Sequence, residues 1–218
     1  MTFDQIRKDE AIRIYISQAD ASLGVLGFTE HSFPHVNRVA QITGYVLETM
    51  GYPERTVELG KIAGYLHDIG NLVNRVDHSQ SGAVMAFRIL DKMGFPPEEI
   101  AAITTAIGNH DEGTGVPVSA MAAALILADK SDVRRSRVRE QEMSSFDAHD
   151  RVNYSVTNSE LKIDDAKTVA KLELTVDTQF SSVMNYFEIF MKRMILCRSA
   201  AERLGLRFKL IINDQELV

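Results

Sequence analysis

The sequence has one cysteine, no long apolar run and no excess of positive charge. The single cysteine, Cys197, excludes an internal disulfide and favours a reducing compartment. The longest apolar run, residues 120–128, is too short to span a bilayer, and the first residues lack the apolar segment of a signal peptide. A net charge of −6 argues against a broad nucleic-acid surface. We therefore expect a cytoplasmic protein that uses neither a membrane nor a nucleic acid as its partner.

Helical patterns cover most of the first 130 residues of the 218-residue chain. Helices are expected over residues 4–26, 33–50, 53–69, 78–93, 97–110 and 119–130. The last of these is apolar on nearly all sides, which is typical of a central helix. In the helix after Pro53, His67 and Asp68 are expected in the final turn, with Gly70 just past its end. Phe87 is expected on a buried face. This pattern predicts a mainly α fold built on a helical bundle.

The C-terminal third has a different pattern. Two stretches of alternating apolar and polar residues, 152–163 and 168–176, predict a β-hairpin. A long amphipathic helix over residues 183–204 follows and ends at Gly205, and residues 207–214 predict a last strand. The expected arrangement is a small α+β unit of the β-β-α-β type.

The change of pattern predicts two domains, a helical domain over residues 1–145 and an α+β subdomain over residues 146–218. The exposed edge of the hairpin could pair with a second copy, so a homodimer is one expected role of the subdomain, and regulation is another. His149 stands alone in this part of the sequence, which indicates no separate catalytic cluster there.

Histidines and aspartates stand where the expected helices bury a face or end. They are His35, His67, Asp68, His78, His110 and Asp129. Taken singly, each is explained as well by a core histidine bonded to a carbonyl, a loop histidine, or a carboxylate paired with an arginine. Taken together, imidazole and carboxylate groups are the donors that Fe²⁺, Mn²⁺ and Zn²⁺ use in proteins. A closed bundle would bring them together and form a metal site.

The order and spacing of these residues resembles the HD-domain superfamily of metal-dependent phosphohydrolases over residues 31–140. The most specific parts are HDIG at residues 67–70 and ADKSD at residues 128–132. The resemblance implies that four residues hold a first metal: His35, His67, Asp68 and Asp129. His78 and His110 would complete a second site bridged by Asp68, or would donate to phosphate beside a single metal. One or two divalent ions are implied, with Fe or Mn preferred to Zn, Ni, Co or Mg.

The resemblance also implies an activity, the hydrolysis of a phosphate ester or anhydride by a metal-activated hydroxide. Asp68 would serve as the bridging catalytic ligand, and Lys130, beside Asp129, as a catalytic phosphate contact. Four arginines are further candidates for binding the substrate: Arg38, Arg134, Arg135 and Arg137. A charged, solvated face explains these arginines equally well. The expected partner is a small phosphorylated molecule, with a nucleotide favoured.

Departures from related patterns narrow the substrate. GTGVP at residues 113–117 is similar to a loop of the HD-GYP cyclic-di-GMP phosphodiesterases, but Val116 replaces its tyrosine and Asn109 replaces a histidine. Asn71 stands where those enzymes have a lysine, so cyclic-di-GMP is not expected. Two other functions share the same residues: a di-iron oxygenase, which would depend on O₂, and a ligand sensor with the C-terminal unit as its output.

Overall fold

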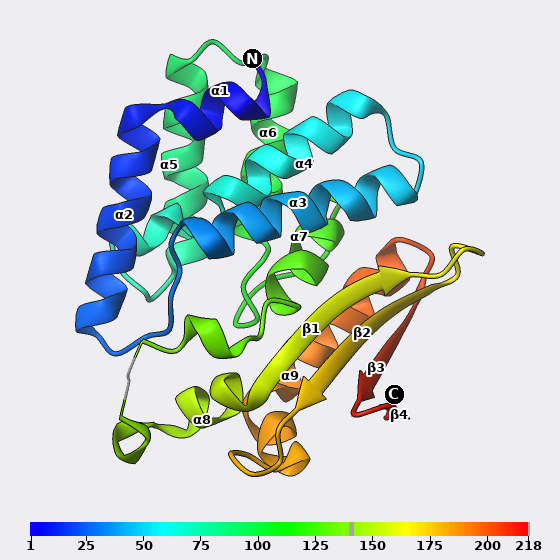
Figure 1. Ribbon diagram of the computed structural model, residues 1–218. Coiled ribbons are helices and arrows are strands. Elements are labelled where there is room, and N and C mark those ends of the chain that lie inside the picture. The colour runs from blue at the N-terminus through cyan, green and yellow to red at the C-terminus, as the bar shows by residue number, and fades with distance from the viewer. Residues whose placement is uncertain (140–141, 218) are drawn as a thin grey trace.

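The computed structural model in Figure 1 describes residues 1–139 and 142–217 and shows a helical body with an α+β unit beside it. The helices of the body are α1 (Phe3–Lys8), α2 (Glu10–Val25), α3 (Phe33–Thr49), α4 (Glu54–Leu66), α5 (His78–Lys92), α6 (Pro97–Gly108) and α7 (Ala120–Lys130). Three short 3-10 turns also occur: η1 (Ile69–Leu72), η2 (Arg135–Arg137) and η3 (Met143–Ser145). The mainly α class expected from the sequence is confirmed.

In the part of the chain that the structure describes, the C-terminal unit combines one sheet with two helices. Its elements are α8 (Ala148–Ser155), β1 (Val156–Ile163), β2 (Val169–Val176), α9 (Val183–Arg203), β3 (Arg207–Ile212) and β4 (Gln215–Glu216). The strand order is β1-β2-β3-β4, with β1 antiparallel to β2, β2 parallel to β3, and β3 antiparallel to β4. The predicted hairpin, long helix and final strand are all present, and the short strand β4 was not expected. Strand β1 lies at the edge of the sheet, where it could pair with a second copy. That pairing stays a prediction.

The hairpin starts later in the sequence than predicted. Residues 152–155 belong to α8, although they alternate in the manner of a strand. The side chain of Asp147 accepts a hydrogen bond from the backbone N–H of Asp150, and this cap starts a helix. Val152 and Ser155 are then buried on one face of that helix. An alternation over only four residues fits the period of a helix as well as that of a strand, and here the capping hydrogen bond favours the helix.

Helix α7 is the centre of the molecule, as its apolar sequence predicts. Residues 121–128 are all buried. Ala122 and Leu125 pack into the core of the helical body, whereas Leu127 packs into a second core with Leu172 and Phe190 of the C-terminal unit. One helix therefore supports both parts, and the proposed boundary near residue 145 stays a prediction. Within the described residues, no helix has the length and apolar character needed to cross a membrane.

The end of α4 differs from the prediction. The helix stops at Leu66, so His67 is its C-cap and Asp68 begins the turn η1. Gly70 is not a left-handed cap, since its φ is not among the positive values. A Cβ at Gly70 would instead lie 2.0 Å from the backbone oxygen of His78. The glycine is needed because the start of α5 packs directly on this turn, and that contact brings His78 close to Asp68.

Helix α5 starts at His78, and its buried face differs from the expected one at Phe87. Asp77 occupies the N-cap position in a left-handed conformation (φ 55°), and its side chain makes no capping hydrogen bond. Ala83, Ala86 and Leu90 are buried, but Phe87 is 51% exposed, so its predicted burial was wrong. Gly82, Ala83 and Ala86 make the middle of this buried face small, which lets the helix lie close to its neighbours.

Candidate metal centre

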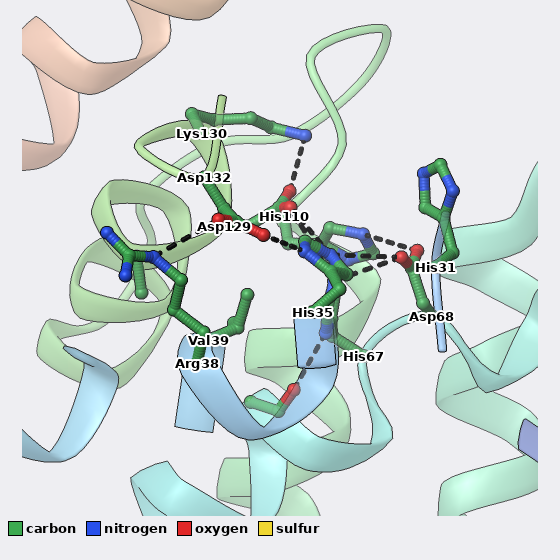
Figure 2. A network of polar contacts seen from close by, with 12 residues as sticks. His31, His35, Arg38, Val39, His67, Asp68, His110, Asp129, Lys130 and Asp132 are labelled. Atoms are coloured by element: carbon green, nitrogen blue, oxygen red, sulfur yellow. Dashed lines mark hydrogen bonds and ion pairs between the residues drawn. The ribbon is translucent and has the colours of Figure 1, made fainter. Parts of the chain in front are cut away.

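Four of the predicted residues form a first group at the middle of the helical body. His35 comes from α3, His67 and Asp68 follow α4, and Asp129 lies in the last turn of α7 (Figure 2). The Nε2 atom of His35 lies 3.3 Å from Nε2 of His67, 3.4 Å from Oδ2 of Asp68 and 3.4 Å from Oδ1 of Asp129. Donor atoms about 2.1 Å from one ion lie roughly 3 to 3.5 Å from each other. The spacing of this group therefore fits a single metal ion.

A second group lies on the other side of the Asp68 carboxylate. Nε2 of His78 lies 3.2 Å from Nε2 of His110 and 3.4 Å from Oδ1 of Asp68. Oδ2 of Asp68 faces His35 and His67, so the two oxygens of one carboxylate are divided between the two groups. Asp111 stands at the margin, with its Oδ1 3.9 Å from His78. All six residues predicted from the sequence are thus brought together.

Three of the four histidines contact a backbone oxygen through Nδ1. Nδ1 of His67, His78 and His110 contacts the backbone oxygens of Gly64, Arg75 and Ile107, respectively, at 2.8, 3.1 and 2.6 Å. A carbonyl oxygen only accepts, so each of these Nδ1 atoms carries a proton, and in His78 and His110, whose rings are neutral, Nε2 presents a lone pair. The facing Nε2 atoms of His78 and His110 therefore have no hydrogen to share. A cation between them removes this repulsion, so the donor set fits a metal.

The buried, negatively charged carboxylates of the first group favour a bound cation. His35 and His67 are fully buried, and Asp68 is nearly so. Burial lowers the pKa of His67, but the carboxylates of Asp68 and Asp129 outweigh burial and raise that pKa to about 10. Burial also opposes ionisation of Asp68, yet the neighbouring imidazoles hold its pKa well below the usual range. The carboxylates stay ionised in a buried place, where negative charge needs a positive partner.

The second group has a different electrostatic character. Burial, reinforced by the charge of His67, lowers the pKa of His110 to about 3. Burial likewise lowers the pKa of His78. Both rings therefore stay neutral at ordinary pH and keep the lone pairs that a metal requires.

Asp132 contacts the first group and is a candidate site residue that sequence reasoning missed. Its Oδ2 accepts a hydrogen bond from Nδ1 of His35 at 2.7 Å, and its side chain is fully buried. A carboxylate in this position fixes the tautomer of a ligating histidine and directs Nε2 toward the metal. Asp132 is the last residue of ADKSD, so the motif contained the signal, but only Asp129 was assigned from it.

Lys130 is buried between two carboxylates. Its Nζ lies 2.7 Å from Oδ2 of Asp129 and 2.5 Å from Oε2 of Glu112. Burial lowers the pKa of Lys130, but the charges of Asp129 and Glu112 outweigh it and raise the pKa above the usual value. Lys130 is therefore a fixed cation that orients Asp129, and its predicted contact with a substrate phosphate stays a prediction.

The four predicted arginines lie in two places. Arg38 and Arg134 both bind Oδ1 of Asp132, at 3.1 and 2.8 Å, and with Arg135 they line a pocket of about 380 Å³ against β1. In Figure 2, Arg38 approaches Asp132 from the side away from Asp68. Arg137 is buried and donates to the backbone oxygens of Glu30 and Asp132 at 2.8 Å each. Among the four, it is Arg137 that lines the pocket beside His31.

That second pocket, of about 400 Å³, adjoins the centre and contains residues that the sequence did not single out as site residues. His31 lines it, and the His31 ring lies 5.5 Å from the ring of His35. Arg75 also lines it and donates to Oδ1 of Asn71, whose amide in turn donates to Asp68. His149, which stood alone in the sequence, lines the same pocket. These residues come from distant segments, so spacing could not have grouped them.

The chain is similar to known proteins over much of its length. The chain matches the HD domain family over residues 33–151, more than half of its length. It is 25% identical over 192 residues to the uncharacterised protein MJ1020 of Methanocaldococcus jannaschii, and the match covers 78% of this chain and 74% of that protein. A predicted HD superfamily hydrolase from an uncultured Thermotogales bacterium is 26% identical, with 57% of this chain and 67% of that chain covered and a TM-score of 0.46. The chain is a member of the HD domain family.

Proposed function

We propose that this protein is a metal-dependent phosphohydrolase that cleaves a phosphate ester or anhydride of a small molecule, with a nucleotide as the favoured substrate. The observation that carries the proposal is the division of the Asp68 carboxylate. One oxygen faces His35 and His67, and the other faces His78. A carboxylate shared in this way can bridge two neighbouring cations, an arrangement that suits displacement at phosphorus.

Two sets of residues would hold the ions. The first set is His35, His67, Asp68 and Asp129, and the second is His78, His110 and Asp68. Imidazole and carboxylate donors together suit Fe²⁺ and Mn²⁺, and Zn²⁺ as well. Ions bound there would supply Lewis acidity, which stabilises charge on phosphoryl oxygens and lowers the pKa of a water molecule.

The residues around the centre would bind and orient the substrate. Arg75 is our candidate for the phosphate contact, because it lines the adjoining pocket and a guanidinium can bond two phosphate oxygens at once. Its link through Asn71 to Asp68 keeps it beside the centre. Arg137 lines the same pocket and is held by two backbone oxygens, so it offers a fixed positive charge. Lys130 would act by holding Asp129 in place.

A phosphate-release screen tests the proposal. Metal-free protein is supplied with Mn²⁺ or Fe²⁺ under anaerobic conditions and offered a panel of phosphorylated small molecules. We expect metal-dependent release of phosphate, and we expect Asp129→Asn to lose about a hundredfold or more of it. Asp91→Asn makes the same chemical change in an exposed ion pair on α5 and should retain full activity. Product formation only in the presence of O₂ would overturn the proposal in favour of an oxygenase.

A further inference from the structure

The pocket that adjoins the metal centre has walls from both parts of the chain. The helical body contributes Phe28, His31, Arg75, Glu112 and Arg137, among others. Helices α8 and α9 of the C-terminal unit contribute His149, Asp150, Asn153, Phe190 and Arg193. A volume of about 400 Å³ is within the range of sites for small organic ligands. The C-terminal unit is therefore part of this pocket and does not stand apart from it.

Each wall of the pocket carries an arginine whose guanidinium lies over a phenylalanine ring. In the helical body, the guanidinium of Arg75 lies 5.4 Å from the ring centroid of Phe28, which is 39% exposed. In α9, the guanidinium of Arg193 lies 4.5 Å from the ring centroid of Phe190. Guanidinium planes and aromatic faces both stack on flat rings, and they do so on any base. Phe190 is buried, so the exposed Phe28 ring and the Arg193 guanidinium are the two flat groups that favour a ligand with a planar ring.

The C-terminal wall is connected to the metal centre by ion pairs. Nε of Arg193 donates to Oε1 of Glu112 at 3.0 Å. Oε2 of the same Glu112 binds Lys130, and Lys130 binds Asp129. A series of fixed charges thus runs from α9 to a residue of the first group. A ligand that contacts Arg193 lies beside the centre, because one acidic side chain separates Arg193 from Lys130.

We propose that this pocket binds the organic part of the substrate, that this part is a nucleoside, and that α8 and α9 form the wall that recognises its ring. The proposal rests on the phosphohydrolase function proposed above. The phosphate lies toward Arg75 and the centre, and the base stacks within reach of Phe28 and Arg193. His149 and Asn153 border the pocket with polar groups that suit the edge of a base or a ribose hydroxyl. The C-terminal unit is then a specificity element of the active site.

Steady-state kinetics with two substrates test the proposal. Adenosine 5′-monophosphate carries a ring, and O-phosphoserine carries the same phosphate ester without one. We expect a KM for the nucleotide at least about tenfold lower, and we expect Phe28→Ala to raise the nucleotide KM by a larger factor than the O-phosphoserine KM and so to reduce that difference. Phe87→Ala removes an exposed phenylalanine from α5, outside the pocket, and should keep the wild-type preference. Arg193→Lys keeps the positive charge but loses the planar guanidinium group, so it should raise the nucleotide KM more than it changes kcat.

Binding to metal-free protein separates the two proposals. Isothermal titration in EDTA measures the affinity for each compound without turnover. One outcome is that the nucleotide binds more tightly than O-phosphoserine, that Phe28→Ala abolishes this difference, and that no metal gives phosphate release. This outcome would support the pocket and overturn the phosphohydrolase function. Phosphate release from both compounds with equal KM, unchanged in Phe28→Ala and Arg193→Lys, would support the function and overturn the pocket assignment.

Discussion

Replacing Asp132 by asparagine should weaken the first metal group without touching a ligand. Asp132 is fully buried and accepts the hydrogen bond that holds Nδ1 of His35, at 2.7 Å. Asparagine has the same shape but no charge, and its amide can turn an N–H group toward His35. The bond that keeps Nε2 of His35 directed at Asp68 and Asp129 is thereby weakened.

The size of the effect follows from the kind of hydrogen bond that is lost. A hydrogen bond to a charged group contributes about 1.5–3 kcal/mol, against about 0.5–1.5 kcal/mol for a neutral one. The difference of about 1 to 1.5 kcal/mol corresponds to roughly 5- to 13-fold in metal affinity. Loss of an outer partner of a ligating histidine typically costs about 10- to 100-fold. The carboxylate also binds Arg38 and Arg134, so we expect a lower melting temperature as well.

The assay is a competition titration of Mn²⁺ between metal-free protein and a fluorescent chelator, well below the melting temperature of the variant. Glu99→Gln is the matched control, because Glu99 binds Arg55 through both oxygens at 2.8 and 2.5 Å. The control variant loses the carboxylate of an ion pair with an arginine away from the metal centre, so it should keep the wild-type affinity for Mn²⁺. Unchanged Mn²⁺ affinity in Asp132→Asn would refute the positioning role of Asp132.

Three further predictions concern the second group, the turn after α4 and the cysteine. His110→Ala should lower the metal content by about one ion per chain and leave the first group occupied, as elemental analysis would show. Gly70→Ala should destabilise the fold by about 3 kcal/mol in urea unfolding, because its Cβ would lie 2.0 Å from the backbone oxygen of His78. Gly108→Ala is the control, since its Cβ would meet its nearest neighbour at 3.6 Å, and it should change stability by about 1 kcal/mol or less. Burial raises the pKa of Cys197 from 9.0 to about 12, so at pH 8 iodoacetamide should label the native thiol about a thousandfold more slowly than a free one. Because the unfolded thiol ionises first, its contribution to stability should fall as the pH rises from about 9 toward 12.

The helical body could be predicted from the sequence because its signals are local. Apolar spacing marks the helices, and the all-round apolar character of residues 121–128 marks the central one. Histidines and aspartates at buried faces or helix ends can then be grouped by assuming that the bundle closes. The structure brings those six residues together, whereas their roles as ligands stay proposals until metal is measured.

The residues that surround the centre could not be predicted in the same way, because their partners are far apart in sequence. Asp132 and His35 are 97 positions apart, so no spacing rule connects them. Arg193 reaches Glu112 over 81 positions, and only the packing of α9 on the helical body shows the contact. Gly70 illustrates a local signal read wrongly: a glycine after a helix suggests a cap, but here it permits a close backbone contact with α5.

Metal content measures the central claim most directly, since the claim is that Asp68 joins two metal-binding groups. Protein purified without oxygen and reconstituted with Mn²⁺ or Fe²⁺ should contain about two ions per chain by elemental analysis. Asp68→Ala removes the shared carboxylate and should lose most of both ions while keeping its helical circular dichroism. Wild-type protein without bound metal, or an Asp68→Ala variant with the full wild-type content, would contradict the account.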